Sequence, residues 1–295
     1  MKRVFCLILS LLLLLPAVSP AELEEEDLLI EETFDDEGNS GDTETAEEPA
    51  VEKPAGAVWD FPVALEDMKP EFLVLANKHY LLDKDYFVKP LVKVKKLKLG
   101  KDGSVKTAGV RWAVGSQMKL QEDCWKALVE MSDAAREDGY NLYLKSAYRS
   151  YSTQNTMYKN RLKKNHGKDD GWVSMAGASD HQTGLGCDVI PRSWIKASGM
   201  NSKMAKEPEC QWMAEHCQEF GFIVRYPEDK EEVTEIHYEP WHMRYVGIPV
   251  ATYIMENNLC LEEFTEELQL AIQVYLDAGG DRSRVEAFIQ KPTEE

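Results

Sequence analysis

The stretch that decides the architecture of this chain is Ser179-Asp180-His181-Gln182-Thr183-Gly184-Leu185-Gly186-Cys187-Asp188. It places a histidine and an aspartate seven residues apart, and the glycines between them permit a tight turn. A histidine on a loop and an aspartate on a strand can then converge on one ion. Alone, the pair is weak support for a metal site, because loops and strands contain such pairs by chance.

A second segment, Glu239-Pro240-Trp241-His242, follows about fifty residues later. Two histidines and one aspartate form a ligand set for catalytic zinc that leaves a position open for water. Glu239 adds the proton acceptor that a metal-activated water requires. Pro240 argues against a helix here, so the segment differs from the helical H-E-x-x-H zinc motif. In an ideal strand Glu239 and His242 would point to opposite faces, so both reach one site only if the backbone bends locally.

Outward from these segments, the patterns predict one continuous α+β domain from about residue 59 onward. In residues 121–138, for example, apolar side chains fall on one helical face and Gly139 supplies a left-handed stop. Helices are predicted over residues 121–138, about 150–165, 209–220, 249–257 and 261–276. Strands are predicted over residues 140–146, 185–190, 222–225 and 236–244, with extended, edge-like segments over 73–78 and 86–94.

The N-terminal residues have a different character. Residues 1–21 read as a secretory signal peptide: Lys2 and Arg3 precede an apolar run, and small residues follow it. An uncleaved membrane anchor is the alternative, although the run is short for a span. Residues 22–57 hold fifteen acidic residues and one lysine, and this composition predicts a disordered linker. The domain proper is predicted over residues 58–295.

The net charge of −18 therefore comes mainly from the linker, which carries −14 of it. Nucleic-acid binding is not expected, because no basic stripe is available to neutralise phosphates. The run from Lys93 to Lys98 is interpreted as a strand with one solvated face. Five cysteines remain after signal removal, and no CxxC occurs. We therefore expect neither a disulfide framework nor a cysteine zinc site, but buried small hydrophobic residues.

Three further motifs carry a family resemblance. They are Ser146-Ala147-Tyr148-Arg149-Ser150-Tyr151-Ser152-Thr153-Gln154, the stretch from Ser179 to Leu185, and Tyr238-Glu239-Pro240-Trp241-His242-Met243-Arg244-Tyr245-Val246-Gly247. Together they resemble the VanY-type D-alanyl-D-alanine carboxypeptidases, zinc peptidases related to lysostaphin-like enzymes and the hedgehog domain. The resemblance covers about residues 70–262, with a helical extension over 263–295. It implies a single compact domain with a small antiparallel sheet flanked by helices.

The resemblance also implies roles for particular residues. His181, Asp188 and His242 would bind one Zn2+ per chain. Glu239 would take a proton from the attacking water and pass it to the leaving amine, and Arg149 would stabilise charge on the substrate carbonyl. The residues that would line the pocket for the terminal D-Ala are Ser179, Gln154 and Tyr151.

The implied substrate is a peptidoglycan stem peptide ending in D-Ala-D-Ala, and the implied location is secreted or in the cell envelope. A membrane is a partner only if the signal segment is left uncleaved. One alternative is a zinc endopeptidase that cuts wall cross-bridges or L,D bonds. Another is a non-catalytic zinc-binding module that recognises the wall, although such a module would not need Glu239. The chain departs from the family pattern at Asp180, where Glu is common, and at Glu235, where Gly is frequent. Together with His237, Glu235 could alter the pocket rim.

Overall fold

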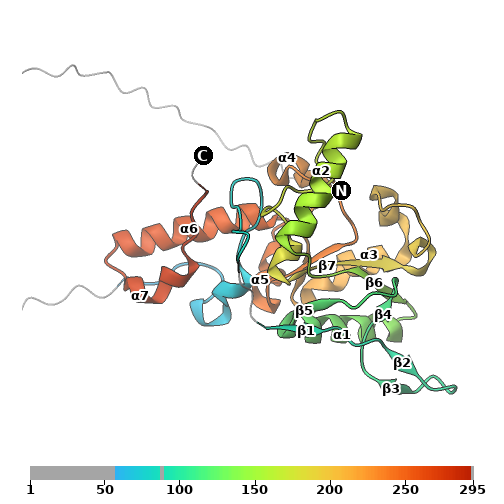
Figure 1. Ribbon diagram of the computed structural model, residues 1–295. Coiled ribbons are helices and arrows are strands. Elements are labelled where there is room, and N and C mark those ends of the chain that lie inside the picture. The colour runs from blue at the N-terminus through green and yellow to red at the C-terminus, as the bar shows by residue number, and fades with distance from the viewer. Residues whose placement is uncertain (1–56, 87–89, 294–295) are drawn as a thin grey trace, which may run out of the picture. The chain divides into compact units, whose positions relative to one another are not determined.

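A five-stranded sheet forms the centre of the domain in the computed structural model (Figure 1). Its strands lie in the order β4-β6-β7-β9-β8. Their bounds are Arg111–Trp112 for β4, Leu142–Ser146 for β6, Gly186–Pro191 for β7, His242–Tyr245 for β9 and Phe222–Val224 for β8. β4 runs parallel to β6, and the other neighbouring strands are antiparallel. The sheet is therefore mixed, whereas the family resemblance implied an antiparallel sheet. All six residues of β7 are buried, which makes β7 the central strand of the core.

Two antiparallel pairs of short strands lie beside this sheet. β1 (Leu91–Lys93) pairs with β5 (Lys119–Gln121), and β2 (Lys98–Leu99) pairs with β3 (Val105–Thr107). The β2–β3 hairpin projects from the end of the domain opposite α6, at the lower right of Figure 1.

Helices flank the sheet, as the sequence predicted. α1 (Glu122–Glu137) packs against β6 and the β1–β5 pair, and α3 (Pro208–His216) packs against β7. α2 (Tyr151–Lys164) begins at Ser150, whose hydroxyl accepts a hydrogen bond from the Thr153 amide at 3.3 Å. Such a side-chain cap satisfies one of the free amides of the first turn. The start of α2 is therefore fixed next to Arg149.

A second apolar core joins the two ends of the domain. Residues of the segment 63–75 pack against α5 (Ile248–Glu256), α6 (Leu261–Asp277) and α7 (Arg282–Val285). The remaining short elements are α4 (Glu231–Thr234) and the 3-10 turns Leu65–Asp67, Pro70–Phe72, Asp180–Thr183, Arg192–Trp194, Ser202–Lys206, Cys217–Phe220, Glu228–Lys230 and Glu286–Phe288. Because α6 and α7 share this core with the first residues of the domain, the C-terminal extension is an integral part of the fold.

The structure describes residues 57–86 and 90–293. The predicted signal peptide and all but the last residue of the predicted acidic linker lie outside these ranges. Within them, no helix has the length and apolar character that a membrane span requires. The five cysteines at positions 124, 187, 210, 217 and 260 are all free, and all are buried, as the sequence analysis expected.

The structure differs from some of the predicted strands and extended segments. Residues 73–78 form no strand, and the backbone oxygens of Phe72 and Val74 accept hydrogen bonds from the Arg244 guanidinium instead. The strand predicted over 236–244 begins only at His242, because residues 239–242 form a turn closed by the His242 amide and the Glu239 oxygen at 3.1 Å. Residues 87–89 of the predicted extended segment 86–94 lie outside the described ranges, and among its described residues the strand comprises Leu91–Lys93.

Candidate metal centre and binding pocket

The 3-10 turn Asp180–Thr183 places the first candidate ligand, His181. The turn ends at Gly184, whose φ of 71° lies in the left-handed region that glycine adopts without strain. His181 Nδ1 lies 2.7 Å from the Ala147 oxygen, so this nitrogen donates and Nε2 is left free to bind a metal. Gly186 allows the chain to turn back closely, since a Cβ there would lie 2.8 Å from the Cβ of Asp180. Gly184 and Gly186 therefore permit the tight turn that the sequence predicted.

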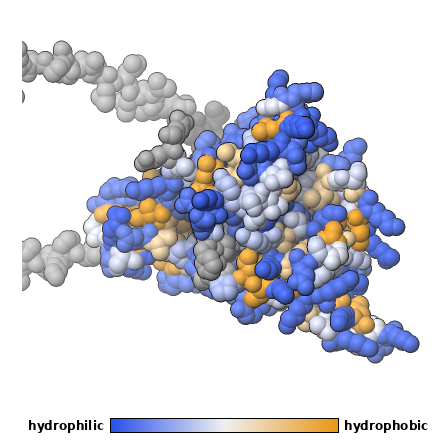
Figure 2. All heavy atoms as spheres, in the orientation of Figure 1, coloured by the Kyte–Doolittle hydropathy of each residue, from blue (hydrophilic) through white to orange (hydrophobic). Residues whose placement is uncertain are grey.

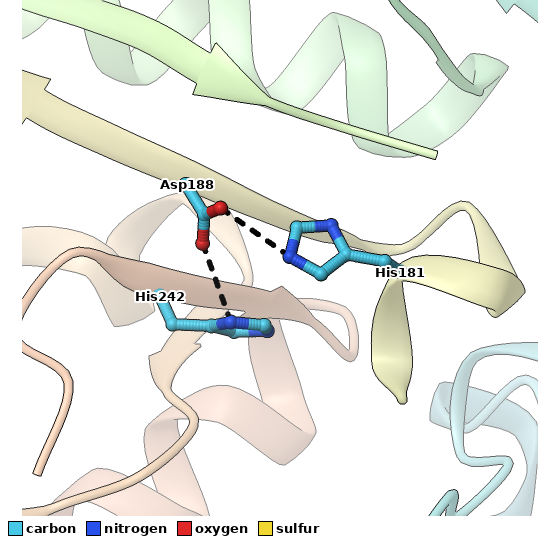
Figure 3. Close-up of side chains that lie close together, drawn as sticks. All are labelled: His181, Asp188 and His242. Atoms are coloured by element: carbon cyan, nitrogen blue, oxygen red, sulfur yellow. Dashed lines mark ion pairs between the residues drawn. The ribbon is translucent and has the colours of Figure 1, made fainter. Parts of the chain in front are cut away.

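The other two candidate ligands face each other across neighbouring strands. Asp188 of β7 pairs in register with His242 of β9. One carboxylate oxygen of Asp188 lies 3.4 Å from His181 Nε2, and the other lies 3.4 Å from His242 Nδ1 (Figure 3). One donor atom from each of the three residues lies within 4.8 Å of the other two, and all three side chains are buried. The structure thus brings the predicted ligand set together.

The charges around these three residues fit a cation. Burial alone would raise the pKa of Asp188, but the two imidazoles outweigh it and hold the pKa well below its usual range. Burial and the nearby Arg149 lower the pKa of His181, which favours the neutral imidazole that binds metals. Burial opposes protonation of His242, yet Asp188 and Glu239 raise its pKa to about 10. Two carboxylates therefore draw positive charge to His242 Nδ1, where a divalent ion would satisfy both.

Glu239 reaches the same point because of the turn before β9. Its Oε2 lies 3.3 Å from His242 Nδ1, and the turn that brings it there is the bend the sequence required but did not reveal. The Glu239 amide donates to the Tyr226 oxygen at 3.1 Å, which fixes the turn from the other side. Burial raises the pKa of Glu239, although His242 opposes this shift. A carboxylate with a raised pKa is suited to accept and release a proton.

Arg149 lies next to the loop that carries His181. Its amide donates to the His181 oxygen at 3.0 Å, so its backbone is tied to the metal centre. Its guanidinium donates to Gln154 Oε1 at 2.6 Å, and Gln154 in turn donates to the Ser174 oxygen at 2.6 Å. No carboxylate in the described ranges forms an ion pair with Arg149. Its Nη2 also donates to the Ser146 hydroxyl at 3.4 Å, and its remaining donors are available to a ligand.

These groups line one cavity of about 560 Å3. Of the predicted site residues, it contains Arg149, Gln154, Ser179, His181, Asp188, Glu239 and His242. Tyr151 does not line it; a Cβ on Gly177 would lie 3.5 Å from its ring. Trp241 is buried and also contributes to the wall. The volume is in the range typical of pockets that bind small molecules.

Several lining residues were not assigned from the sequence. They include Met157, Arg161, Trp172, Met200, Tyr226 and Ile236. Met157 and Arg161 follow Gln154 by three and seven residues, so the helical period of α2 places them on its pocket-facing side. The Tyr226 ring lies 5.0 Å from the ring of His242. Trp172 lies in a polar loop that gave no signal in the sequence.

Behind the metal centre lies a group of four buried charged residues, which we call the buried ion cluster: Asp180, Arg225, Arg244 and Glu262. Asp180 pairs with Arg244 through one oxygen and lies 2.8 Å from Arg225 Nε through the other. Arg225 also forms two hydrogen bonds with Glu262 of α6, at 2.7 and 2.6 Å. The cluster links the ligand loop to the C-terminal helix, a connection that no pattern in the sequence indicated.

An α+β domain that gathers two imidazoles, a carboxylate and an adjacent glutamate in one cavity defines a zinc-dependent hydrolase. A family model described as D-alanyl-D-alanine carboxypeptidase, VanY, matches residues 117–248. The chain is 34% identical over 198 residues to "Putative carboxypeptidase YodJ" of Bacillus subtilis (strain 168), an alignment that covers 67% of this chain and 68% of that protein. The chain belongs to the VanY D-alanyl-D-alanine carboxypeptidase family.

Two further comparisons agree with this family assignment. A D-alanyl-D-alanine carboxypeptidase of Enterococcus faecium is 32% identical over 171 residues, which is 58% of this chain and 52% of that protein. The chain therefore spans about half the length of this enterococcal relative. The solved structure of the LdcB LD-carboxypeptidase is 33% identical, with a TM-score of 0.58, and covers 67% of this chain and 87% of that one. The protein is accordingly a zinc metallocarboxypeptidase whose candidate metal site is His181, Asp188 and His242.

Proposed function

We propose that the protein removes the terminal D-Ala from peptidoglycan stem peptides. The observation that carries this proposal is the shared cavity, which Glu239 and Arg149 line together with the three candidate metal ligands. The family also includes the enterococcal relative named a D-alanyl-D-alanine carboxypeptidase. Zinc bound by His181, Asp188 and His242 supplies Lewis acidity, which makes water a competent nucleophile near neutral pH.

Glu239 acts as the general base in this proposal. Its carboxylate faces the metal site, and its raised pKa brings proton exchange closer to neutrality. It accepts the proton of the attacking water and then donates it to the amine of the departing D-Ala. The turn at residues 239–242 holds it for both transfers.

Arg149 stabilises the charge that develops on the scissile carbonyl oxygen. Its guanidinium is held by Gln154 and has no carboxylate partner among the residues that the structure describes, so its charge is available for an oxyanion. Ser179 and Gln154 contribute polar groups to the wall where the terminal D-Ala binds. Tyr151 has no substrate contact in this proposal, since its ring lies beside Gly177 and does not line the cavity.

A second candidate is cleavage of an L,D bond in a stem peptide. The specific support is the similarity to the LdcB LD-carboxypeptidase over two thirds of this chain. The same metal ligands, base and arginine would serve either bond. Only the shape of the cavity around the residue on the amino side of the bond would distinguish them.

We also propose that the enzyme works outside the cytoplasm. The support is the signal-like pattern of residues 1–21 together with a substrate class found in the cell wall. N-terminal sequencing of the protein recovered from the culture medium or envelope fraction tests this proposal. A mature chain that begins near Glu22 is expected, whereas recovery from the cytoplasm with Met1 intact would contradict it.

The central test uses the zinc-loaded protein and three substrates. They are an acyl-L-Lys-D-Ala-D-Ala peptide, the same peptide without its last residue, and cross-linked muropeptides. Mass spectrometry of the first should show loss of a single D-Ala that a chelator abolishes. Cleavage of only the shortened peptide would shift the assignment to the L,D bond. Cleavage of only the muropeptides would indicate an endopeptidase.

A further inference from the structure

The segment 91–111, which contains the projecting β2–β3 hairpin, differs in charge from the rest of the domain. We call it the basic arm. It holds six lysines and Arg111 but only one carboxylate, Asp102. The domain from residue 58 onward has a net charge of −6, so the arm contributes +6 and the remainder −12. Figure 2 shows the hydrophilic tip of the arm at the lower right, away from the body of the domain.

The six lysines of the arm are exposed and form no ion pair with any residue that the structure describes. They are Lys93, Lys95, Lys96, Lys98, Lys101 and Lys106. No carboxylate among the described residues lies within ion-pair distance of any of them. Asp102 does not neutralise them, because its Oδ1 accepts hydrogen bonds from the amide and hydroxyl of Ser104 at 3.1 and 2.7 Å. Those hydrogen bonds lower the pKa of Asp102 and hold the turn at the tip of the hairpin.

The positive charge is arranged at a cost to stability. Lys93 lies directly opposite Lys119 in the β1–β5 pair, and like charges in that position repel each other. Backbone hydrogen bonds nevertheless hold the arm together. The Gly100 amide donates to the Ser104 oxygen at 2.6 Å, the Leu97 amide donates to the Val110 oxygen at 2.8 Å, and the Val110 amide donates to the Lys95 oxygen at 3.1 Å. A fixed surface of unpaired lysines attracts an extended anion.

We propose that the basic arm binds a linear phosphate polymer that lacks bases, such as a polyol-phosphate chain. Lysine presents a compact charge without fixed geometry, which suits a flexible phosphodiester backbone. Val105 is the only large hydrophobic side chain exposed on the arm. The arm therefore offers no aromatic platform for stacking nucleic-acid bases and no apolar anchor for a membrane. The acidic remainder of the domain is repelled by the same polymer.

The arm therefore directs the enzyme onto an anionic matrix. The end of the domain that carries the β2–β3 hairpin makes contact with the matrix first. This binding is separate from catalysis, because none of the six lysines lines the cavity that holds the metal centre. Loss of the arm's charge should leave the cleavage of a small soluble peptide unchanged. A failure of this inference is thereby distinguishable from a failure of the proposed function.

The test measures binding of the zinc-loaded protein to poly(glycerol phosphate) and to long-chain inorganic polyphosphate by sedimentation or anisotropy. The arm variant carries Lys95→Gln, Lys96→Gln, Lys98→Gln and Lys106→Gln. The matched control removes the same charge elsewhere, with Lys159→Gln, Lys163→Gln, Lys164→Gln and Lys168→Gln. Because phosphate binding releases counterions, wild-type affinity should fall on the order of 100-fold between ~50 and ~200 mM salt.

The arm variant should bind both polymers at least about tenfold more weakly at the lower salt, and the control within about twofold of wild type. Unchanged release of product from a soluble peptide shows that both variants are folded. The inference is overturned if wild type binds neither polymer or if the control loses as much affinity as the arm variant. Tighter binding to oligo(dT) or to phosphatidylglycerol vesicles than to poly(glycerol phosphate) would also overturn it, in favour of a nucleic acid or a membrane.

Discussion

The metal centre and the buried ion cluster are adjacent, and both hold charged groups away from solvent, but they differ in how those charges are balanced. In the buried ion cluster two carboxylates face two guanidinium groups, with short contacts that link all four residues. In the metal centre two carboxylates converge on one imidazole nitrogen of His242, at 3.4 and 3.3 Å. Arg149, nearby, has no carboxylate partner in the described part of the chain.

The difference separates structural charge from functional charge. A closed set of buried charges contributes to the architecture and depends on every member, because removal of one leaves its partner uncompensated. An open set carries charges that await a ligand, and it contributes little to stability until that ligand binds. Asp180 belongs to the closed set, yet its carboxylate also lies 3.9 Å from His242 Nε2, so the two sets touch at this residue.

The largest effect on activity is expected for Glu239→Gln. The amide retains the size of the side chain but cannot take the proton from water, so kcat should fall about 10^3- to 10^4-fold. Zinc content and the free energy of unfolding should stay close to wild type, since the carboxylate belongs to the open set. Steady-state kinetics with metal analysis and urea unfolding measure all three. Glu228→Gln, an exposed residue, serves as the control.

The largest effect on stability is expected for Glu262→Gln. Loss of this carboxylate leaves Arg225 with an uncompensated buried charge, which should cost about 3–5 kcal/mol of unfolding free energy. Activity per folded molecule should change little, because Glu262 touches neither the cavity nor a metal ligand. Urea denaturation of this variant and of the exposed Glu266→Gln makes the comparison. Equal stability of the two variants would remove the basis for calling the cluster closed.

A smaller loss is expected for Arg149→Lys. Lysine keeps the charge but loses the planar fork that Gln154 orients, so we expect a decrease in kcat of about 10^2-fold with little change in stability. A decrease in kcat of about 10^2-fold together with a large loss of stability would place Arg149 in the closed set. Single-turnover rates and thermal unfolding separate these outcomes.

The smallest effect is expected for Ser179→Ala. One hydrogen bond to a bound substrate contributes about 1 kcal/mol, so KM should rise roughly five- to tenfold while kcat stays nearly constant. Ser179 is buried at the cavity wall, so a fall in kcat with no change in KM would instead indicate that it positions His181. The kinetic constants for one soluble peptide are sufficient for this measurement.

Much of the fold could be predicted because local patterns coincide with the elements. The helix predicted over 121–138 is found over 122–137, and the strand predicted over 185–190 is found over 186–191. The strand predicted over 236–244 failed because the side-chain pattern does not reveal the hydrogen bond that closes the turn at Glu239. The parallel pairing of β4 with β6 also had no local signal.

The metal ligands could be predicted because their chemistry is rare and their spacing is short. The buried ion cluster could not, because its four members are spread from Asp180 to Glu262 and each is an ordinary charged residue by itself. Only the fold brings α6 against the segment that carries Arg225. The basic run at Lys93 was visible as a charge pattern, but from the sequence it was interpreted as a strand with one solvated face and not as a surface for phosphates. Its projection from the domain, on which the proposed phosphate binding depends, came from the structure.

Zinc titration of the metal-free protein tests the central claim most directly, with unfolding temperature and release of D-Ala followed on the same samples. If His181, Asp188 and His242 form a single site for zinc, both signals should rise together and reach their limit at one zinc per chain. With free zinc at ~100 times its dissociation constant, the gain in stability should be about 2.7 kcal/mol. Activity in the metal-free protein, or a rise in activity with no rise in stability, would contradict the account.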